Sequence, residues 1–500
     1  MTAPGTADDP VVWGTARGRW VLLAAVLGSG VALLDSTVVN VALPTLGRDL
    51  GADFADLQWT VNGYTLTLAA LILLGGSLGD RFGRRRVFVV GTVWFGVASL
   101  LCALAPNVGT LVAARALQGV GGALLTPGSL ALLSASFAGA DRARAIGAWS
   151  GLGGIAAAIG PFVGGALVEI SWRLVFLINL PLCAVVVAVA VRHVPESRDP
   201  EMAPQLDLTG AALGAAGLGA LTYALVAAGE QVTAGVVVTA LTGLVALGAF
   251  VVVERRSRHP MLPVDIFAER QFTAANGVTF AVYAALGAVF FLLVVHLQVV
   301  AGFTPLVAGT ALLPVTVLML LLSPRSGALA ARIGPRIQMT VGPLLCAGGV
   351  LLLLRVGTEA SYLIDVLPAV TLFGLGLSTV VAPLTTTVLA AAPSRHAGTA
   401  SGVNNAVART AGLLAVAVLP VVSGLSGDDY ENAGAFAAGF RTAMLLSAAL
   451  LVVGAVLSAL TIGRFELDDA AAPDESQERP PDRHCAIDGP AARPRAPARP

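Results

Sequence analysis

Apolar runs long enough to cross a membrane follow one another along almost the whole chain. The hydrocarbon core of a bilayer is about 30 Å thick, so a helix needs about 20 apolar residues to cross it. Fourteen segments approach that length, at 19–43, 58–79, 87–105, 110–136, 144–168, 173–192, 207–228, 233–253, 273–300, 306–330, 337–355, 362–390, 399–424 and 438–462. The pattern predicts an all-α polytopic membrane protein with fourteen spans.

The distribution of basic residues predicts the orientation of these spans. All thirty basic residues are Arg, and eighteen lie in connections on the side of the N-terminus against four on the opposite side. Cytoplasmic loops of membrane proteins are rich in basic residues, and an even number of spans puts both ends on one side. We therefore expect both termini in the cytoplasm. The first apolar run is too long for a signal peptide and contains Asp35, so we interpret it as a retained span.

Composition excludes several classes of protein. A chain that is 56% hydrophobic and 12% charged is too apolar for a soluble protein. The absence of Lys excludes a phosphate-binding P-loop and a pyridoxal-phosphate Schiff base. The four Cys and five His are scattered, so we expect no metal site and no cofactor. The zero net charge gives no argument for nucleic acid, and the Arg-only basic set with abundant Ala and Gly favours a GC-rich bacterial source.

An internal repeat predicts the domain organisation. Gly76-Ser-Leu-Gly-Asp-Arg81-Phe-Gly83-Arg-Arg returns as Gly327-Ala-Leu-Ala-Ala-Arg332-Ile-Gly334-Pro-Arg336, an offset of 332 − 81 = 251 residues. Two homologous six-helix bundles would then be separated by two additional spans. Parallel repeats of this kind are typical of transporters, with the substrate site between the halves. We expect a cytoplasmic segment at 1–18, a first bundle at 19–194, an inserted helix pair at 195–260, a second bundle at 261–462 and a disordered tail at 463–500.

Two charged residues lie deep in the first half, where an ionisable side chain is costly and therefore marks a site. Asp35 precedes Pro44 by nine residues and Arg115 follows Gly109 by six, so both lie at similar depth below the outer surface. A buried carboxyl can take up and release a proton, which predicts a proton-coupling role for Asp35 with Arg115. The alternative is a permanent ion pair that ties two helices together.

Further polar residues at membrane depth are candidates for a substrate cavity. Asn40 shares the polar face of Asp35, and Gln118 shares a face with Arg115 and two glycines. In the second half we single out Gln298 as a cavity residue. We interpret the other deep polar residues there as helix contacts rather than substrate ligands. They are His296, Arg325, Asn404, Asn405 and Arg409.

Two further segments have unusual patterns. The turn after the second span combines glycines with opposite charges, and we interpret it as a cytoplasmic latch that would hold the bundles together through Gly76, Asp80, Arg81, Gly83, Arg84 and Arg85. The fifth span carries a stripe of small residues that permits close helix packing and bending at Gly154, Gly160, Pro161, Gly164 and Gly165. Ordinary small-residue packing explains the stripe equally well.

These motifs resemble those of a known family. Leu34-Asp35-Ser-Thr-Val-Val-Asn40-Val-Ala-Leu-Pro44, Gly76 to Arg86, Arg115-Ala-Leu-Gln118-Gly119 with Pro127, the fifth-span stripe, and Trp172-Arg173 with Asn179 and Pro181 occur in the order typical of the major facilitator superfamily. The chain is similar, over residues 19 to 462, to its 14-spanning drug:proton antiporter branch of the QacA/EmrB type. Ala331 stands where the first loop has Asp80, which argues against a symmetric latch.

The resemblance implies a function for the whole chain. It implies alternating access by two rocking bundles, with cytoplasmic substrate exchanged for incoming protons, Arg115 in proton transfer and the fifth-span stripe as an antiporter motif. We expect a monomeric exporter of hydrophobic small molecules in the cell membrane, driven by the proton motive force. Because Asp35 is the one carboxylate placed well inside a span, we expect neutral or monocationic substrates. The alternatives are a dedicated exporter of a self-made metabolite or antibiotic, or a uniporter or symporter; an enzyme is excluded.

Overall fold

The computed structural model describes residues 11–198, 207–257, 260–391, 397–427, 429 and 432–463. Within these ranges the chain forms helices and turns and no strand. Thirteen helices there are long and apolar enough to cross a membrane. A further 32-residue helix, α5 (Gly139–Ile170), takes the fifth position, where a span is predicted. The all-α membrane architecture is confirmed, while the number of fourteen spans stays a prediction.

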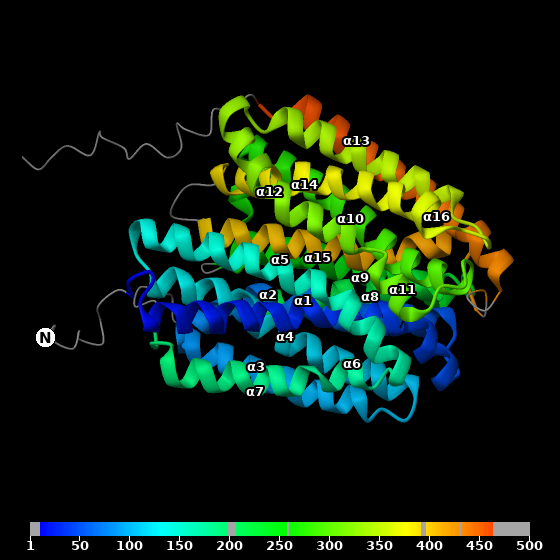
Figure 1. The fold of residues 1–500 in the computed structure, drawn as a ribbon. Coiled ribbons are helices and arrows are strands. Elements are labelled where there is room, and N and C mark those ends of the chain that lie inside the picture. Colours follow the sequence, from blue (N-terminus) through cyan, green and yellow to red (C-terminus); the bar gives the residue numbers. More distant parts are fainter. Residues whose placement is uncertain are drawn as a thin grey trace, which may run out of the picture.

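The helices gather into two bundles that lie side by side, with the start of the first helix and the end of the last at the same end of the molecule (Figure 1). The first bundle contains α1 (Ala16–Leu50), α2 (Phe54–Phe82), α3 (Arg84–Ala103), α4 (Val108–Ser136), α5, α6 (Leu174–Leu177) and α7 (Asn179–His193). The second contains η1 (Val264–Ala268), α10 (Arg270–Val299), α11 (Pro305–Thr310), α12 (Leu313–Ile333), α13 (Arg336–Leu352), η2 (Leu353–Arg355), η3 (Tyr362–Val366), α14 (Leu367–Ala390), α15 (Ala397–Val422) and α16 (Ala433–Thr461).

Two additional helices follow the first bundle, as the repeat predicts. They are α8 (Leu208–Ala227) and α9 (Ala234–Arg256). The α8 helix packs against α9 and also against α2 of the first bundle and α15 of the second. Most side chains of α9 are exposed although the helix is strongly apolar, which fits contact with lipid tails. Residues 1–10 of the predicted segment 1–18 and residues 464–500 of the predicted tail 463–500 lie outside the described residues.

The first helix extends further than its sequence pattern predicts. The predicted span ends at residue 43, before Pro44, but α1 continues through Pro44 to Leu50. A proline within a helix removes one backbone hydrogen bond without always ending it, and the Arg48 Nε donates to the Pro44 carbonyl at 3.2 Å. The helix ends at Gly51, which has a left-handed conformation with φ of 61°. Asp35 is therefore 50 − 35 = 15 residues, about 22 Å, from this end, and not the nine residues predicted from Pro44.

The bundles contact each other closely at the end far from the start of α1. Phe54, the first residue of α2, packs against Phe291 of α10 and Phe436 of α16 at ring distances of 5.9 and 6.3 Å. Its backbone N–H donates to the Gly427 carbonyl at 2.9 Å. These contacts bury aromatic surface between the two halves, and they hold this end of the bundle interface closed.

Candidate functional site

Asp35 and Arg115 meet in the centre of the first bundle. The Arg115 Nη1 lies 2.6 Å from the Asp35 Oδ2, and both side chains are almost completely buried. Asp35 comes from the middle of α1 and Arg115 from the first turns of α4, which are neighbouring helices. The structure brings the two side chains together. Their role in proton coupling stays a prediction.

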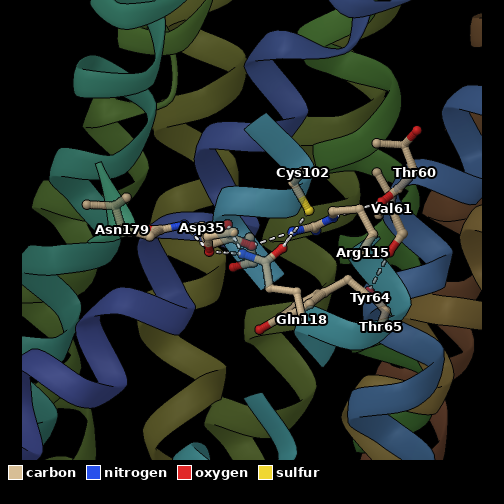
Figure 2. A network of polar contacts seen from close by, with 12 residues as sticks. Asp35, Thr60, Val61, Tyr64, Thr65, Cys102, Arg115, Gln118 and Asn179 are labelled. Carbon is tan, nitrogen blue, oxygen red and sulfur yellow. Dashed lines mark hydrogen bonds and ion pairs between the residues drawn. The ribbon is translucent and has the colours of Figure 1, made fainter. Parts of the chain in front are cut away.

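Two amides complete the surroundings of the carboxylate (Figure 2). The Gln118 Nε2 and the Asn179 Nδ2 each donate to the Asp35 Oδ1 at 2.8 Å. Both amides also donate to the Ser99 hydroxyl oxygen, at 2.8 and 3.3 Å. Asp35 thus accepts three hydrogen bonds from side chains of α4 and α7, and all of these groups are fully buried. Such a carboxylate is satisfied in its ionised form.

Arg115 has further partners besides Asp35. Its Nε donates to the Thr60 carbonyl at 3.1 Å, and its Nη1 also donates to the Gln118 Oε1 at 2.6 Å. Its guanidinium carbon lies 4.5 Å from the centre of the Tyr64 ring, a distance typical of a cation–π interaction. Arg115 would therefore keep several interactions if Asp35 became neutral. The site can accommodate a proton on Asp35 without leaving a buried cation entirely unpaired.

Close helix packing brings these side chains together. A Cβ atom on Gly119 would lie 2.3 Å from the Tyr64 carbonyl oxygen, and one on Gly75 would lie 2.1 Å from the Ala123 carbonyl oxygen. Glycines at these two points let α2 and α4 approach backbone to backbone. Arg115 can then reach across to the carbonyl group of Thr60 and to the face of Tyr64 on α2.

The three predicted cavity residues lie in different surroundings. Gln118 belongs to the buried Asp35 network and lines no open cavity in this conformation. Gln298 donates from its Nε2 to the Val41 carbonyl at 3.0 Å, so it joins α10 to α1 at the closed end. Asn40 is partly exposed, and its Oδ1 has no hydrogen-bond partner among the described residues. The structure thus brings Gln118 to Asp35 and leaves Gln298 and Asn40 outside that network.

The turn after α2 is attached to its own bundle. Asp80 pairs with Arg84 one helical turn later at 2.7 Å. Beyond it, the backbone N–H of Arg85 donates to a Glu196 carboxylate oxygen at 3.1 Å, and its guanidinium donates to the Val194 carbonyl at 3.1 Å. Glu196 follows α7 in the first bundle. In this conformation Asp80 pairs within its own bundle, and a latch between the bundles stays a prediction.

Gly83 in this turn has a backbone conformation and a close contact that favour glycine. Gly83 has φ of 113°, and a Cβ at this position would lie 2.7 Å from a Glu196 carboxylate oxygen. The second copy repeats the arrangement, since Gly334 has φ of 80° and the Arg336 guanidinium donates to the Ala459 carbonyl at the end of α16. Arg85 and Arg336 differ by the repeat offset of 251 residues. Each turn thus fixes the last helix of its own bundle, while Gly76 and Arg81 lie on α2 just before the first turn.

The small-residue stripe of α5 lies between the two bundles. A Cβ on Gly160 or Gly164 would collide with Thr37 or Val38 of α1. A Cβ on Gly165 would lie 2.6 Å from the Leu306 Cα, and one on Gly309 would lie 2.2 Å from the Pro161 carbonyl oxygen. Leu306 and Gly309 belong to α11 of the second bundle. The stripe therefore permits direct backbone contact between α5 and α11; for Gly154 the surroundings lie outside the described part of the structure.

Some residues of the site have no signal in the sequence. Ser99 and Tyr64 are isolated polar residues within apolar spans, and only the packing of α3 and α2 against α4 brings them to Gln118 and Arg115. Asn179 is part of a family motif, but its contact with Asp35 depends on how α7 lies beside α1. Among the described residues, no group of three or more His, Cys, Asp or Glu side chains could hold a metal ion.

Comparisons with known proteins identify the relatives of this arrangement. The family model described as Major Facilitator Superfamily matches residues 25–417. The puromycin resistance protein pur8 of Streptomyces alboniger is 39% identical over 83% of this chain and 82% of its own length. The probable actinorhodin transporter of Streptomyces coelicolor is 37% identical over 84% and 76%. Among solved structures, the peptide transporter POT in complex with sulfate superposes with a TM-score of 0.65 at 17% identity, over 91% of this chain and 98% of that one.

Proposed function

Because the chain belongs to the major facilitator superfamily, we propose that it is a proton-coupled antiporter that exports lipophilic small molecules across the cell membrane by alternating access. Its family makes it a multi-pass membrane transporter rather than an enzyme. Relatives that are 36 to 39% identical to it over the aligned residues are named as drug and antibiotic resistance proteins or as an antibiotic transporter, which supports efflux. The direction, the coupling to protons and a monomeric state are parts of the proposal.

The observation that carries the proposal is the buried ion pair between Asp35 and Arg115. Replacing such a pair by apolar residues is often neutral or stabilising, so its presence is weak evidence for a purely structural role. An ionisable residue at membrane depth more often serves transport. Protonation of Asp35 would weaken its bond to Arg115, while the bonds of Arg115 to Thr60 and Gln118 would remain. Arg115 would therefore keep hydrogen bonds in both protonation states of Asp35, as a proton switch requires.

The packing of the bundles supports alternating access. The Arg-rich connections predict that the end with the start of α1 faces the cytoplasm. The contacts of Phe54 with Phe291 and Phe436, and the crossing of α5 with α11, then close the outer side. We propose that this conformation loads substrate from the cytoplasm. Rocking of the bundles would open the outer contacts, and protons entering from outside would neutralise Asp35.

A dedicated exporter of a self-made compound is the second candidate. Two relatives that support it are named as a probable actinorhodin transporter and a tetracenomycin C resistance and export protein. Both candidates use the same switch, and they differ only in the breadth of substrates. A broad panel of compounds distinguishes them, since a dedicated exporter extrudes one chemical family alone.

Energised efflux from cells tests the proposal. A host that lacks its own pumps would express wild type, Asp35→Asn or, as a matched control, Glu169→Gln, which removes an exposed carboxylate from α5. We expect wild type and Glu169→Gln to extrude compounds from a panel that contains anionic, neutral and cationic aromatic dyes. Extrusion should stop with a protonophore or with Asp35→Asn at equal expression. Efflux that persists in the protonophore or in Asp35→Asn would contradict proton coupling through this residue.

A further inference from the structure

Arg409 lies near the middle of α15, where this helix crosses α2 of the other bundle. On one side of the crossing, a Cβ on Gly402 would lie 3.1 Å from a methyl group of Leu73. On the other side, the Gln58 Nε2 donates to the Val416 carbonyl at 2.6 Å. The two helices run antiparallel between these contacts. Arg409 is halfway between Gly402 and Val416, and the point halfway between Gln58 and Leu73 falls between Thr65 and Leu66. Arg409 therefore lies at the level of the turn of α2 that carries Tyr64 and Thr65.

The opposite side of α15 fixes a second neighbour of Arg409. The Asn404 Nδ2 donates to the Thr279 hydroxyl of α10 at 2.8 Å, and a Cβ on Gly287 of α10 would lie 2.8 Å from the Gly412 Cα. These helices run in parallel, so Arg409 lies at the level of Tyr283.

The guanidinium of Arg409 is not compensated by an acidic group. Arg409 is half-buried, and it makes no hydrogen bond, ion pair or cation–π contact within the part of the chain that the structure describes. The deep carboxylate of Asp35 already accepts three bonds from Arg115, Gln118 and Asn179. The region around Tyr64 therefore holds two cations and one anion. An unpaired charge at the middle of a membrane is costly, so it marks a functional group.

We propose that Arg409 recognises the substrate, and that the compounds the protein binds are lipophilic aromatic anions with a carboxylate or phenolate group. A guanidinium binds a carboxylate through two parallel hydrogen bonds, and the half-buried Tyr283 at the same level of α10 offers an apolar ring for an aromatic frame. The inference deepens the proposed export function and rests on it. It replaces the preference for neutral or monocationic substrates, because that expectation needed an Asp35 carboxylate free to receive them.

A second role for Arg409 would give a different result. In this second role, the guanidinium of Arg409 would replace Arg115 as the partner of Asp35 in another conformation and would be part of the proton switch. In that case Arg409→Gln would alter the binding of all compounds in the same way. If Arg409 recognises an anion, the variant changes only the discrimination between compounds of different charge.

Equilibrium binding to the purified full-length chain in lipid nanodiscs tests the proposal without any proton gradient. The probes share one aromatic frame and differ in charge: pyrenebutyrate, its methyl ester and pyrenebutyl-trimethylammonium. Empty nanodiscs correct for partition into lipid. The proteins are wild type, Arg409→Gln, Arg409→Lys and the control Arg441→Gln, which removes an exposed Arg from α16, a helix that packs on α10 and α13.

We expect wild type and Arg441→Gln to bind pyrenebutyrate about tenfold more tightly than the ester, which corresponds to one charge-assisted interaction of about 1.4 kcal/mol. Arg409→Gln should lose this preference with the ester affinity unchanged, and Arg409→Lys should keep part of it. Absence of any preference for the anion in wild type, or a preference that survives in Arg409→Gln, would overturn the proposal. Asp35→Asn should keep the anion preference, so failure of proton coupling and failure of anion recognition are distinguishable.

Discussion

The centres of the two bundles differ in how their charged side chains are satisfied. In the first, Asp35 and Arg115 form a fully buried pair to which Gln118 and Asn179 add hydrogen bonds. In the second, a neutral cluster of Asn404, Asn276 and Thr279 links α15 to α10. Two bundles of related architecture thus hold different chemistry. The first holds a fully buried ion pair, and the second carries the half-buried Arg409 on α15, which packs against α2.

This difference suggests a division of tasks between the halves. A titratable pair is useful only where water and substrate do not compete for its hydrogen bonds, and the Asp35 network is fully buried. A recognition group must remain available, and Arg409 is only half-buried. Tyr64 lies between the two, since its ring faces Arg115 and its turn of α2 lies at the level of Arg409 on α15. Only the side chain of Tyr64 would therefore separate a substrate at Arg409 from the Asp35–Arg115 pair.

Substitution of Arg115 and of Arg409 should give the largest difference in stability between the two bundle centres. Arg115→Gln leaves Asp35 without its ion pair, and loss of one partner of a buried pair costs about 3–5 kcal/mol. Arg409→Gln removes an unpaired cation and should cost less than about 1 kcal/mol. Thermal unfolding of the purified proteins should show a large decrease for the first variant and a small one for the second. The double variant Asp35→Asn/Arg115→Gln should recover part of the loss, and equal losses for both arginines would refute the comparison.

The contact between α5 and α11 joins the two bundles at the outer side. A substitution there tests whether export depends on this contact. Gly165→Ala places a Cβ 2.6 Å from the Leu306 Cα, so the backbones must separate. Overpacking of this kind destabilises the conformation that contains this contact by about 1–3 kcal/mol. The rate of export should therefore fall about tenfold. Gly147→Ala is the matched control on the same helix, because nothing lies within 4 Å of its Cβ position. Unchanged export by Gly165→Ala would show that the contact is not part of the cycle.

A substitution in the neutral cluster of the second bundle should have the smallest effect on stability and transport. Asn404→Ala removes two hydrogen bonds, to Asn276 and Thr279, each of which contributes about 1 kcal/mol. The neighbouring Asn405 has no hydrogen bond in the described residues, so Asn405→Ala is the control. We expect a slightly lower unfolding temperature for Asn404→Ala and the same pH dependence of transport as in wild type. A shifted pH profile would mean that the second bundle also takes part in coupling.

The sequence predicts the helices well and their partners less well. Every predicted span coincides with a described helix, because apolar runs of this length have one stable structure in a bilayer. The meeting of Asp35 with Arg115 was also predictable, since few charges lie at that depth. The extension of α1 beyond Pro44 was not predicted, because a proline signals a probable helix end without deciding it.

Contacts between distant segments account for the remaining errors. The sequence offered no reason to join Arg85 to Glu196, which lie 111 positions apart, or Gln298 to Val41, which lie 257 apart. Such pairs depend on which helices become neighbours and on their rotation about their axes. For the same reason, the sequence does not distinguish Arg409 from the other polar residues of the second half. Its position near Tyr64 follows only from the contacts of Gly402 and Val416 with α2.

Proton movement driven by substrate is the most direct test of Asp35 as the coupling residue. Liposomes that contain the purified protein and a trapped pH-sensitive dye would receive a substrate gradient with no initial pH difference. For wild type, substrate flow should drive protons in the opposite direction and change the internal pH, and a protonophore should abolish the change. For Asp35→Asn, the account predicts no pH change at equal protein content. A pH change in Asp35→Asn equal to that of wild type would contradict it.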